Sequence, residues 1–150
     1  MKLSSSAFQH ERSIPRIYTC QGKDINPPLD ISGVPENAVS LVLIMDDPDV
    51  PKTLRPDGMF DHWVVFNIDP TLTHIEEDAQ PFAIFGQNTY GENCYKGPCP
   101  PDREHRYFFK LYALDTNLSL KKGATKKEVE TKMEGHILAQ TELMGRYVKS

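Results

Sequence analysis

The sequence predicts a mainly β protein, an antiparallel β-sandwich with one or two helices near the C-terminus. Apolar, β-branched and aromatic runs of strand length alternate with clusters of turn residues. The 12 prolines among 150 residues argue against a helical bundle, and helical spacing of apolar residues occurs only after Thr125. This length is usual for one domain, so we expect residues 1–150 to share a single core.

The strongest strand predictions fall at residues 39–45, 62–68 and 106–114. The first run is almost continuously apolar, which suits a strand covered on both faces, and two prolines end it, so residues 46–59 should form a loop. The second run is rich in β-branched and aromatic residues, and the third alternates between two faces. We expect a loop over 71–101 with one short strand at 81–85, and short edge strands or irregular structure over 1–30.

The C-terminal region carries the signals of a helix. Thr125-x-x-Glu128 forms a capping box, and apolar residues then recur at three- and four-residue spacing. The pattern predicts an amphipathic helix that reaches about Tyr147, or two shorter helices, with Gly135 marking a break or a close packing contact.

Charge and cysteine content exclude several classes of protein. The net charge of −4 provides no general attraction for nucleic acid or anionic lipid. Neither a membrane-spanning run nor a secretory signal is present, so we expect a cytoplasmic protein without integral membrane association. The three cysteines are too few for a disulfide framework, and free thiols are the expectation, although Cys94 and Cys99 flank a short loop and could pair under oxidising conditions.

Ionisable residues gather at the ends of the predicted strands. They occur in three segments, residues 46–51, 61–63 and 97–107. Strand ends at one edge of a sandwich lie near one another, so a carboxylate, two imidazoles and a phenol can meet in one shallow cavity. Prolines in the same segments fix φ and stiffen the rim of such a cavity.

Four motifs carry a resemblance to a known family. In order and spacing, Asp47-Pro-Asp-x-Pro51, His62-Trp-Val-Val-Phe-Asn-Ile68, Gly97-Pro-Cys-Pro-Pro101 and His105-Arg-Tyr107 resemble the signature blocks of the phosphatidylethanolamine-binding protein family. The match is close to its bacterial and archaeal branch, the Raf kinase inhibitor-like proteins, and extends over nearly the whole chain. The resemblance implies a sandwich of a large and a small sheet, with a pocket for phosphate-like groups at one end.

The resemblance also implies which residues serve that pocket. The ligand-binding set would be Asp47, His62, Gly97, Pro98, His105 and Tyr107, and the loops would be shaped by Asp49, Pro51, Pro100 and Pro101. The two imidazoles, the phenol and backbone N–H groups near Gly97 can donate to phosphate oxygens. Asp47 would orient a histidine or accept from the ammonium group of a zwitterionic ligand.

An enzyme is the rival interpretation. Asp47, His62 and His105 could serve a hydrolase or a metal-dependent enzyme, with Cys99 as a nucleophile. The sequence lacks His-x3-His and His-Glu-x-x-His spacing and a serine in a nucleophile elbow. We therefore expect a binding protein that is not an enzyme, with no metal and no cofactor. The family name suggests a kinase or protease partner by analogy alone, and a homodimer stays open.

Overall fold

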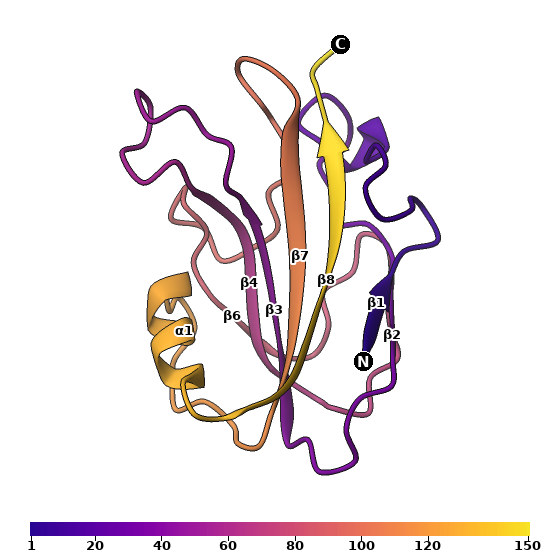
Figure 1. Ribbon diagram of the computed structural model, residues 1–150, viewed down its shortest axis with the longest axis vertical. Coiled ribbons are helices and arrows are strands. Elements are labelled where there is room, and N and C mark those ends of the chain that lie inside the picture. The colour runs from indigo at the N-terminus through magenta and orange to yellow at the C-terminus, as the bar shows by residue number, and fades with distance from the viewer.

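Two antiparallel sheets form the protein (Figure 1) in a computed structural model that describes residues 1–150. The larger sheet has the order β6-β4-β3-β7-β8, and the smaller one the order β1-β2-β5. Their strands are β1 (Lys2–Ser4), β2 (Leu29–Ser32), β3 (Ser40–Asp47), β4 (Phe60–Ile68), β5 (His74–Ile75), β6 (Ile84–Phe85), β7 (His105–Leu114) and β8 (Ile137–Tyr147). The helices are a 3-10 turn, η1 (Arg16–Tyr18), and α1 (Lys126–Met133). The predicted fold class is confirmed.

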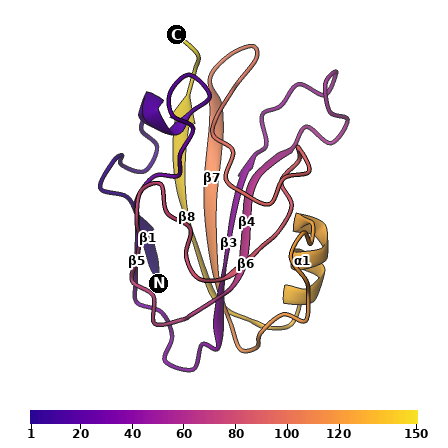
Figure 2. The same ribbon diagram turned by 180° about the vertical axis from the view of Figure 1, so that it is seen from behind.

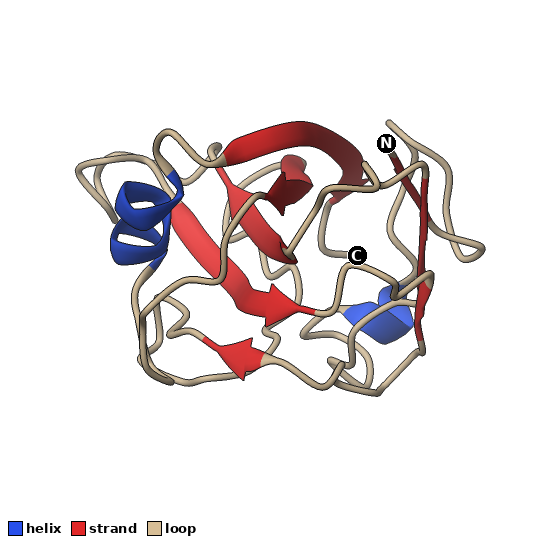
Figure 3. Ribbon diagram, turned by 90° about the horizontal axis from the view of Figure 1, so that it is seen from below, coloured by secondary structure: helices blue, strands red, loops and turns tan.

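The central strand β3 explains how the layers pack. All eight of its residues are buried, because β3 lies between β4 and β7 and is covered on both faces. Leu41, Leu43 and Met45 belong to the core cluster shared with the smaller sheet. Val42 and Ile44 belong to a second cluster that also contains residues of α1. The helix and the smaller sheet therefore cover opposite faces of the larger sheet (Figures 2 and 3).

The region after α1 corrects the helix prediction. The capping box at Thr125 is present, but α1 ends at Met133, and Gly135 has a φ of 80° that continues no helix. Residues 137–147 form β8, which pairs with β7 from Leu114↔Ile137 to His105↔Tyr147. A helix reaching Tyr147 is therefore wrong, because this long antiparallel ladder outweighs the local helical spacing of apolar residues.

The N-terminal segment lies against the outer edge of β8. Backbone N–H groups of Glu11 and Ile14 donate to Met144 and Arg146 at 2.7 and 2.8 Å. A Cβ added at Gly145 would lie 2.4 Å from a side-chain carbon of Ile14, so glycine permits this close approach. The segment therefore covers the C-terminal half of an edge strand.

The cysteines also differ from expectation. Cys20 and Cys99 form a disulfide across 79 residues, and Cys94 is free. The expectation of three free thiols is wrong, and so is the alternative pairing of Cys94 with Cys99. The turn after η1 lies directly against the segment around Pro98, whose carbonyl accepts from the Cys20 N–H at 3.1 Å, and this contact brings the two sulfur atoms together.

The loops that follow β3 and precede β4 and β7 gather at one end of the sandwich, at the top of Figure 1. This is the arrangement expected for the three segments with ionisable residues. Neither helix has the length and hydrophobicity that crossing a bilayer would require.

Candidate functional site

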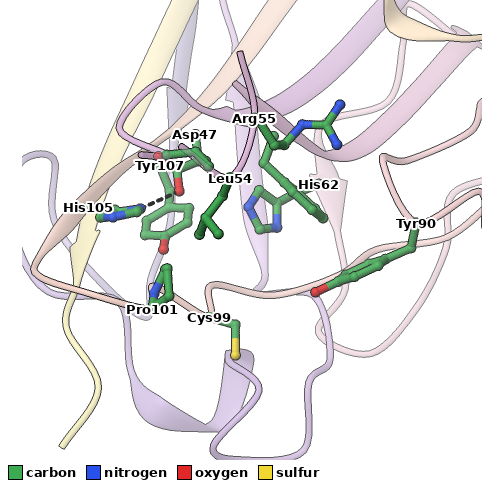
Figure 4. A pocket seen from close by; sticks show the side chains of 11 residues that line it. Asp47, Leu54, Arg55, His62, Tyr90, Cys99, Pro101, His105 and Tyr107 are labelled. Carbon is green, nitrogen blue, oxygen red and sulfur yellow. Dashed lines mark hydrogen bonds and ion pairs between the residues drawn. The ribbon is translucent and has the colours of Figure 1, made fainter. Parts of the chain in front are cut away.

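A cavity of about 310 Å³ opens among these loops (Figure 4). Strands β3, β4 and β7 contribute four of the predicted residues to its wall, namely Asp47, His62, His105 and Tyr107. The remaining lining residues come from β4 and the surrounding loops, and they are Val50, Leu54, Arg55, Phe60, Tyr90, Cys99 and Pro101. The cavity therefore combines a small polar set with an apolar and aromatic rim, which is the usual composition of a small-molecule site.

An irregularity in β4 places His62 in the cavity. Met45 pairs with Trp63, but the next residue, Asp46, pairs with Asp61, so His62 is an extra residue that opposes no partner on β3. Strict alternation would put His62 on the α1 side of the sheet together with Val64. The bulge turns it instead toward the cavity, which is a recognised use of such bulges beside functional sites.

Two backbone contacts with Lys96 fix His62. The Lys96 N–H donates to the His62 carbonyl at 3.0 Å, and the Lys96 carbonyl lies 2.7 Å from Nδ1 of the imidazole. A carbonyl can only accept, so Nδ1 carries the proton and Nε2 has no hydrogen-bond partner in the protein. Burial lowers the pKa of His62 to about 4, and the ring is therefore neutral at pH 7.

His105 is held between two carboxylates. Nδ1 lies 2.6 Å from Asp47, and Nε2 lies 2.6 Å from Asp102. A carboxylate oxygen therefore faces each ring nitrogen, and both nitrogens of His105 are engaged within the protein. Burial raises the pKa of Asp47, and the hydrogen bond with His105 offsets this in part. Burial also acts to raise the pKa of Asp102, but hydrogen bonds and charges from His105 and Arg103 bring it below its usual value.

Tyr107 supplies the one uncommitted donor of the predicted set. Its side chain is fully buried, and its hydroxyl proton has no acceptor in the protein. The backbone N–H of Cys99 interacts with the hydroxyl oxygen and acts to lower the pKa slightly. Figure 4 shows that hydroxyl pointing away from Asp47 and toward Pro101. Burial, together with the nearby charge of Asp47, raises the pKa of Tyr107 well above its usual value, so the phenol stays protonated.

Asp49 ties the loop after β3 to the start of β7. It accepts from Arg106 through the backbone N–H and through two guanidinium nitrogens, at 2.8 to 2.9 Å. These bonds hold the pKa of Asp49 below its usual range. The Asp49 N–H in turn donates to Asp47 at 2.7 Å, and the Pro51 carbonyl accepts from Leu54 at 2.9 Å. The chain from Asp47 to Leu54 is thereby shaped into one wall of the cavity.

Gly97 and Pro98 lie outside the cavity wall. Gly97 packs against the backbone of Tyr18, whose carbonyl oxygen would be 2.1 Å from an added Cβ, and its N–H donates to Asp24 at 2.6 Å. The group that comes close to Gly97 is therefore the backbone of Tyr18 and not a ligand in the cavity. Pro98 and Pro100 are buried, while Pro101 lines the cavity.

The hydrogen-bond pattern changes the expected chemistry. The N–H groups of His62 and Gly97 and both nitrogens of His105 already have partners within the protein. Tyr107 is left as the free donor of the predicted set, and Nε2 of His62 is left as a free acceptor.

Sequence reasoning missed several residues around the cavity. They are Val50, Leu54, Arg55, Phe60, Tyr90 and Asp102. The three-residue spacing from Asp102 to His105 was visible, but it does not show which ring nitrogen a carboxylate reaches. The apolar residues of the rim lie in segments whose loop conformation no periodicity predicts. No group of three or more His, Cys, Asp or Glu side chains is arranged to hold a metal ion.

Comparison with known proteins agrees with the motifs. The sequence profile described as phosphatidylethanolamine-binding protein matches residues 4–148. A Chlamydia trachomatis relative with the name UPF0098 protein is 52% identical over 149 residues, which is 99% of either chain. A relative with the same name from Methanothermobacter thermautotrophicus is 46% identical over 153 residues and covers 98% of either chain. The chain belongs to the phosphatidylethanolamine-binding protein family.

Solved structures of family members have the same architecture. The crystal structure of a phosphatidylethanolamine-binding protein homologue from Chlamydia trachomatis gives a TM-score of 0.96 at 52% identity, covering 99% of this chain and 97% of the other. E. coli YbcL, described as a new member of the mammalian family, gives a TM-score of 0.89 at 27% identity, covering 99% and 98%.

Proposed function

We propose that this family member binds a small phosphate-bearing ligand in the cavity between Asp47, His62 and Tyr107. The observation that carries the proposal is the Tyr107 hydroxyl, a buried donor without a partner on the cavity wall. A phosphate oxygen that accepts from this hydroxyl would supply a partner that the protein itself does not provide. The family name, which refers to a phospholipid head group, points to the same ligand chemistry.

Net charge contributes little to the expected affinity of the cavity for an anion. The cavity wall includes both a carboxylate, Asp47, and a guanidinium, Arg55, so it presents no strongly positive surface to an anion. Hydrogen bonds would therefore supply more of the affinity than net charge. The apolar rim, which includes the largely exposed Leu54 and Tyr90, can contact the carbon part of a phosphomonoester.

Two features support binding rather than catalysis. Both ring nitrogens of His105 are committed to carboxylates, so this ring cannot take a proton from a substrate without losing a bond. Cys99 is in a disulfide, and its sulfur is not available as a thiolate nucleophile. The alternative hydrolase or metal-dependent enzyme built on Asp47, His62 and His105 would need these contacts to rearrange.

Calorimetric titration with inorganic phosphate tests the proposal. Tyr107→Phe removes one hydroxyl and keeps the ring, so phosphate affinity should fall by about tenfold or more, as expected for a hydrogen bond to a charged group worth about 1.5–3 kcal/mol. Tyr112→Phe is the matched control, because Tyr112 lies on β7 outside the cavity. No phosphate binding by the wild type, or equal loss in both variants, would contradict the proposal.

A further inference from the structure

The chemistry of His62 limits which ligands fit the cavity. The ring is 4% exposed, and its only hydrogen-bond partner is the Lys96 carbonyl at Nδ1. Its ring centroid lies 4.6 Å from that of Phe60 and 5.3 Å from that of Tyr107, so aromatic side chains enclose it on two sides. The imidazole is therefore fixed in one orientation, with a lone pair on Nε2 that no protein group uses.

Nε2 and the Tyr107 hydroxyl form a complementary pair on the cavity wall. The hydroxyl can donate to a ligand oxygen, whereas Nε2 can only accept from a ligand O–H or N–H. Both side chains line the same cavity, and Figure 4 draws Leu54 between them. A single hydrogen phosphate group has both partners, because it carries P–O⁻ acceptors and a P–OH donor.

We propose that the cavity selects ligands that donate a hydrogen bond to Nε2 of His62, and so takes hydrogen phosphate or a singly protonated phosphomonoester in preference to sulfate. The inference rests on the proposed phosphate-binding function and adds a requirement to it. Sulfate has the same tetrahedral shape but presents acceptors only. Its oxygen would meet the lone pair of Nε2, and a site built to receive a donor rejects a close analogue that lacks one.

Protonation of His62 would be the other way to accommodate sulfate. Burial lowers the pKa of the ring to about 4 and the ring is enclosed by Phe60 and Tyr107, so the imidazolium is scarce in the free protein. At pH 7 this corresponds to about one molecule in a thousand. Sulfate binding through the imidazolium would be weakened by up to the same factor.

The first experiment compares inorganic phosphate with sulfate by calorimetry at pH 7 and constant ionic strength. We expect the wild type to bind phosphate at least tenfold more tightly. His62→Leu should narrow this gap because it removes the Nε2 acceptor, and His136→Leu, at an exposed site away from the cavity, should leave the gap unchanged.

The second experiment needs no variant and compares methyl phosphate with dimethyl phosphate at pH 5. Both are mainly monoanions at this pH, because a phosphomonoester has its second pKa near about 6, but only methyl phosphate carries a P–OH. We expect methyl phosphate to bind at least tenfold more tightly. Equal affinities within either ligand pair would overturn the donor requirement and leave phosphate binding intact. Absence of phosphate binding would instead overturn the proposed function.

Discussion

Acidification should destabilise the fold through His62. The imidazole is buried and neutral, and its pKa falls from 6.5 to about 4 on folding because burial disfavours the charged ring. Between these two values the unfolded chain binds more protons than the native protein. The stability associated with His62 is therefore fully present above pH 6.5 and is lost as the pH falls toward 4.

The size of the effect follows from the same two values. A difference of 2.5 pH units corresponds to about 3 kcal/mol when the loss is complete. Between pH 7 and pH 5 the linkage relation gives about 2 kcal/mol. Against a total stability of about 5–15 kcal/mol for a typical protein, this change is easily measured.

Urea unfolding at pH 7 and pH 5 measures the loss, and His62→Gln is the comparison protein. Glutamine cannot titrate, although its amide can still donate to the Lys96 carbonyl. Other groups also change the stability of the fold on acidification. Asp49, whose pKa is lowered by Arg106, decreases it, and Asp47, whose pKa is raised by burial, increases it. Both carboxylates are present in the two proteins, so the difference between the two pH responses isolates His62. If His62→Gln loses as much stability as the wild type, the reasoning is refuted.

Three further outcomes are expected. Thiol titration of the unfolded protein without reductant should find one free thiol, and a count of three would refute the pairing. Cys20→Ser with Cys99→Ser should lower the free energy of unfolding by up to about 4.5 kcal/mol, the chain-entropy value for a loop of 79 residues. Lys126→Ala should cost about 1.5–3 kcal/mol in urea unfolding, because it removes a 2.9 Å ion pair with the buried Asp46 carboxylate while Lys110 remains as the second partner of Asp46. Lys127→Ala, at an exposed position, should cost close to zero, and equal costs would contradict the pairing of Lys126 with Asp46. Gly97→Ala should lower the thermal midpoint by several degrees because a Cβ would collide with backbone, and an unchanged midpoint would contradict this packing.

The sequence predicts the sandwich well where burial alone decides the structure. The uninterrupted apolar run of β3 indicates a strand covered on both faces, and the alternation in β7 gives its two faces correctly. The sequence-based prediction fails for β8, where apolar residues at helical spacing form a strand that pairs with β7. Pairing over that length depends on a distant part of the chain, which local spacing does not report.

For the candidate site too, local sequence predicts some features and long-range contacts decide the others. Motif order locates Asp47, His62, His105 and Tyr107 at one cavity, but it does not say which of their donors are already used. The bulge at His62 depends on the register between two strands, and the disulfide at Cys99 depends on a turn 79 residues away. Neither long-range relation can be read from local spacing.

The N-terminal segment beside β8 has a consequence for how the chain can be shortened. Its first fourteen residues provide a strand of the smaller sheet and the backbone partners of Met144 and Arg146. Deleting them would uncover a stretch of unpaired N–H and C=O groups on an edge strand, next to apolar side chains such as Leu143 and Tyr147. We therefore expect a chain that begins at residue 15, which also lacks the core residues Leu3, Phe8 and Ile14, to self-associate by strand addition at this edge.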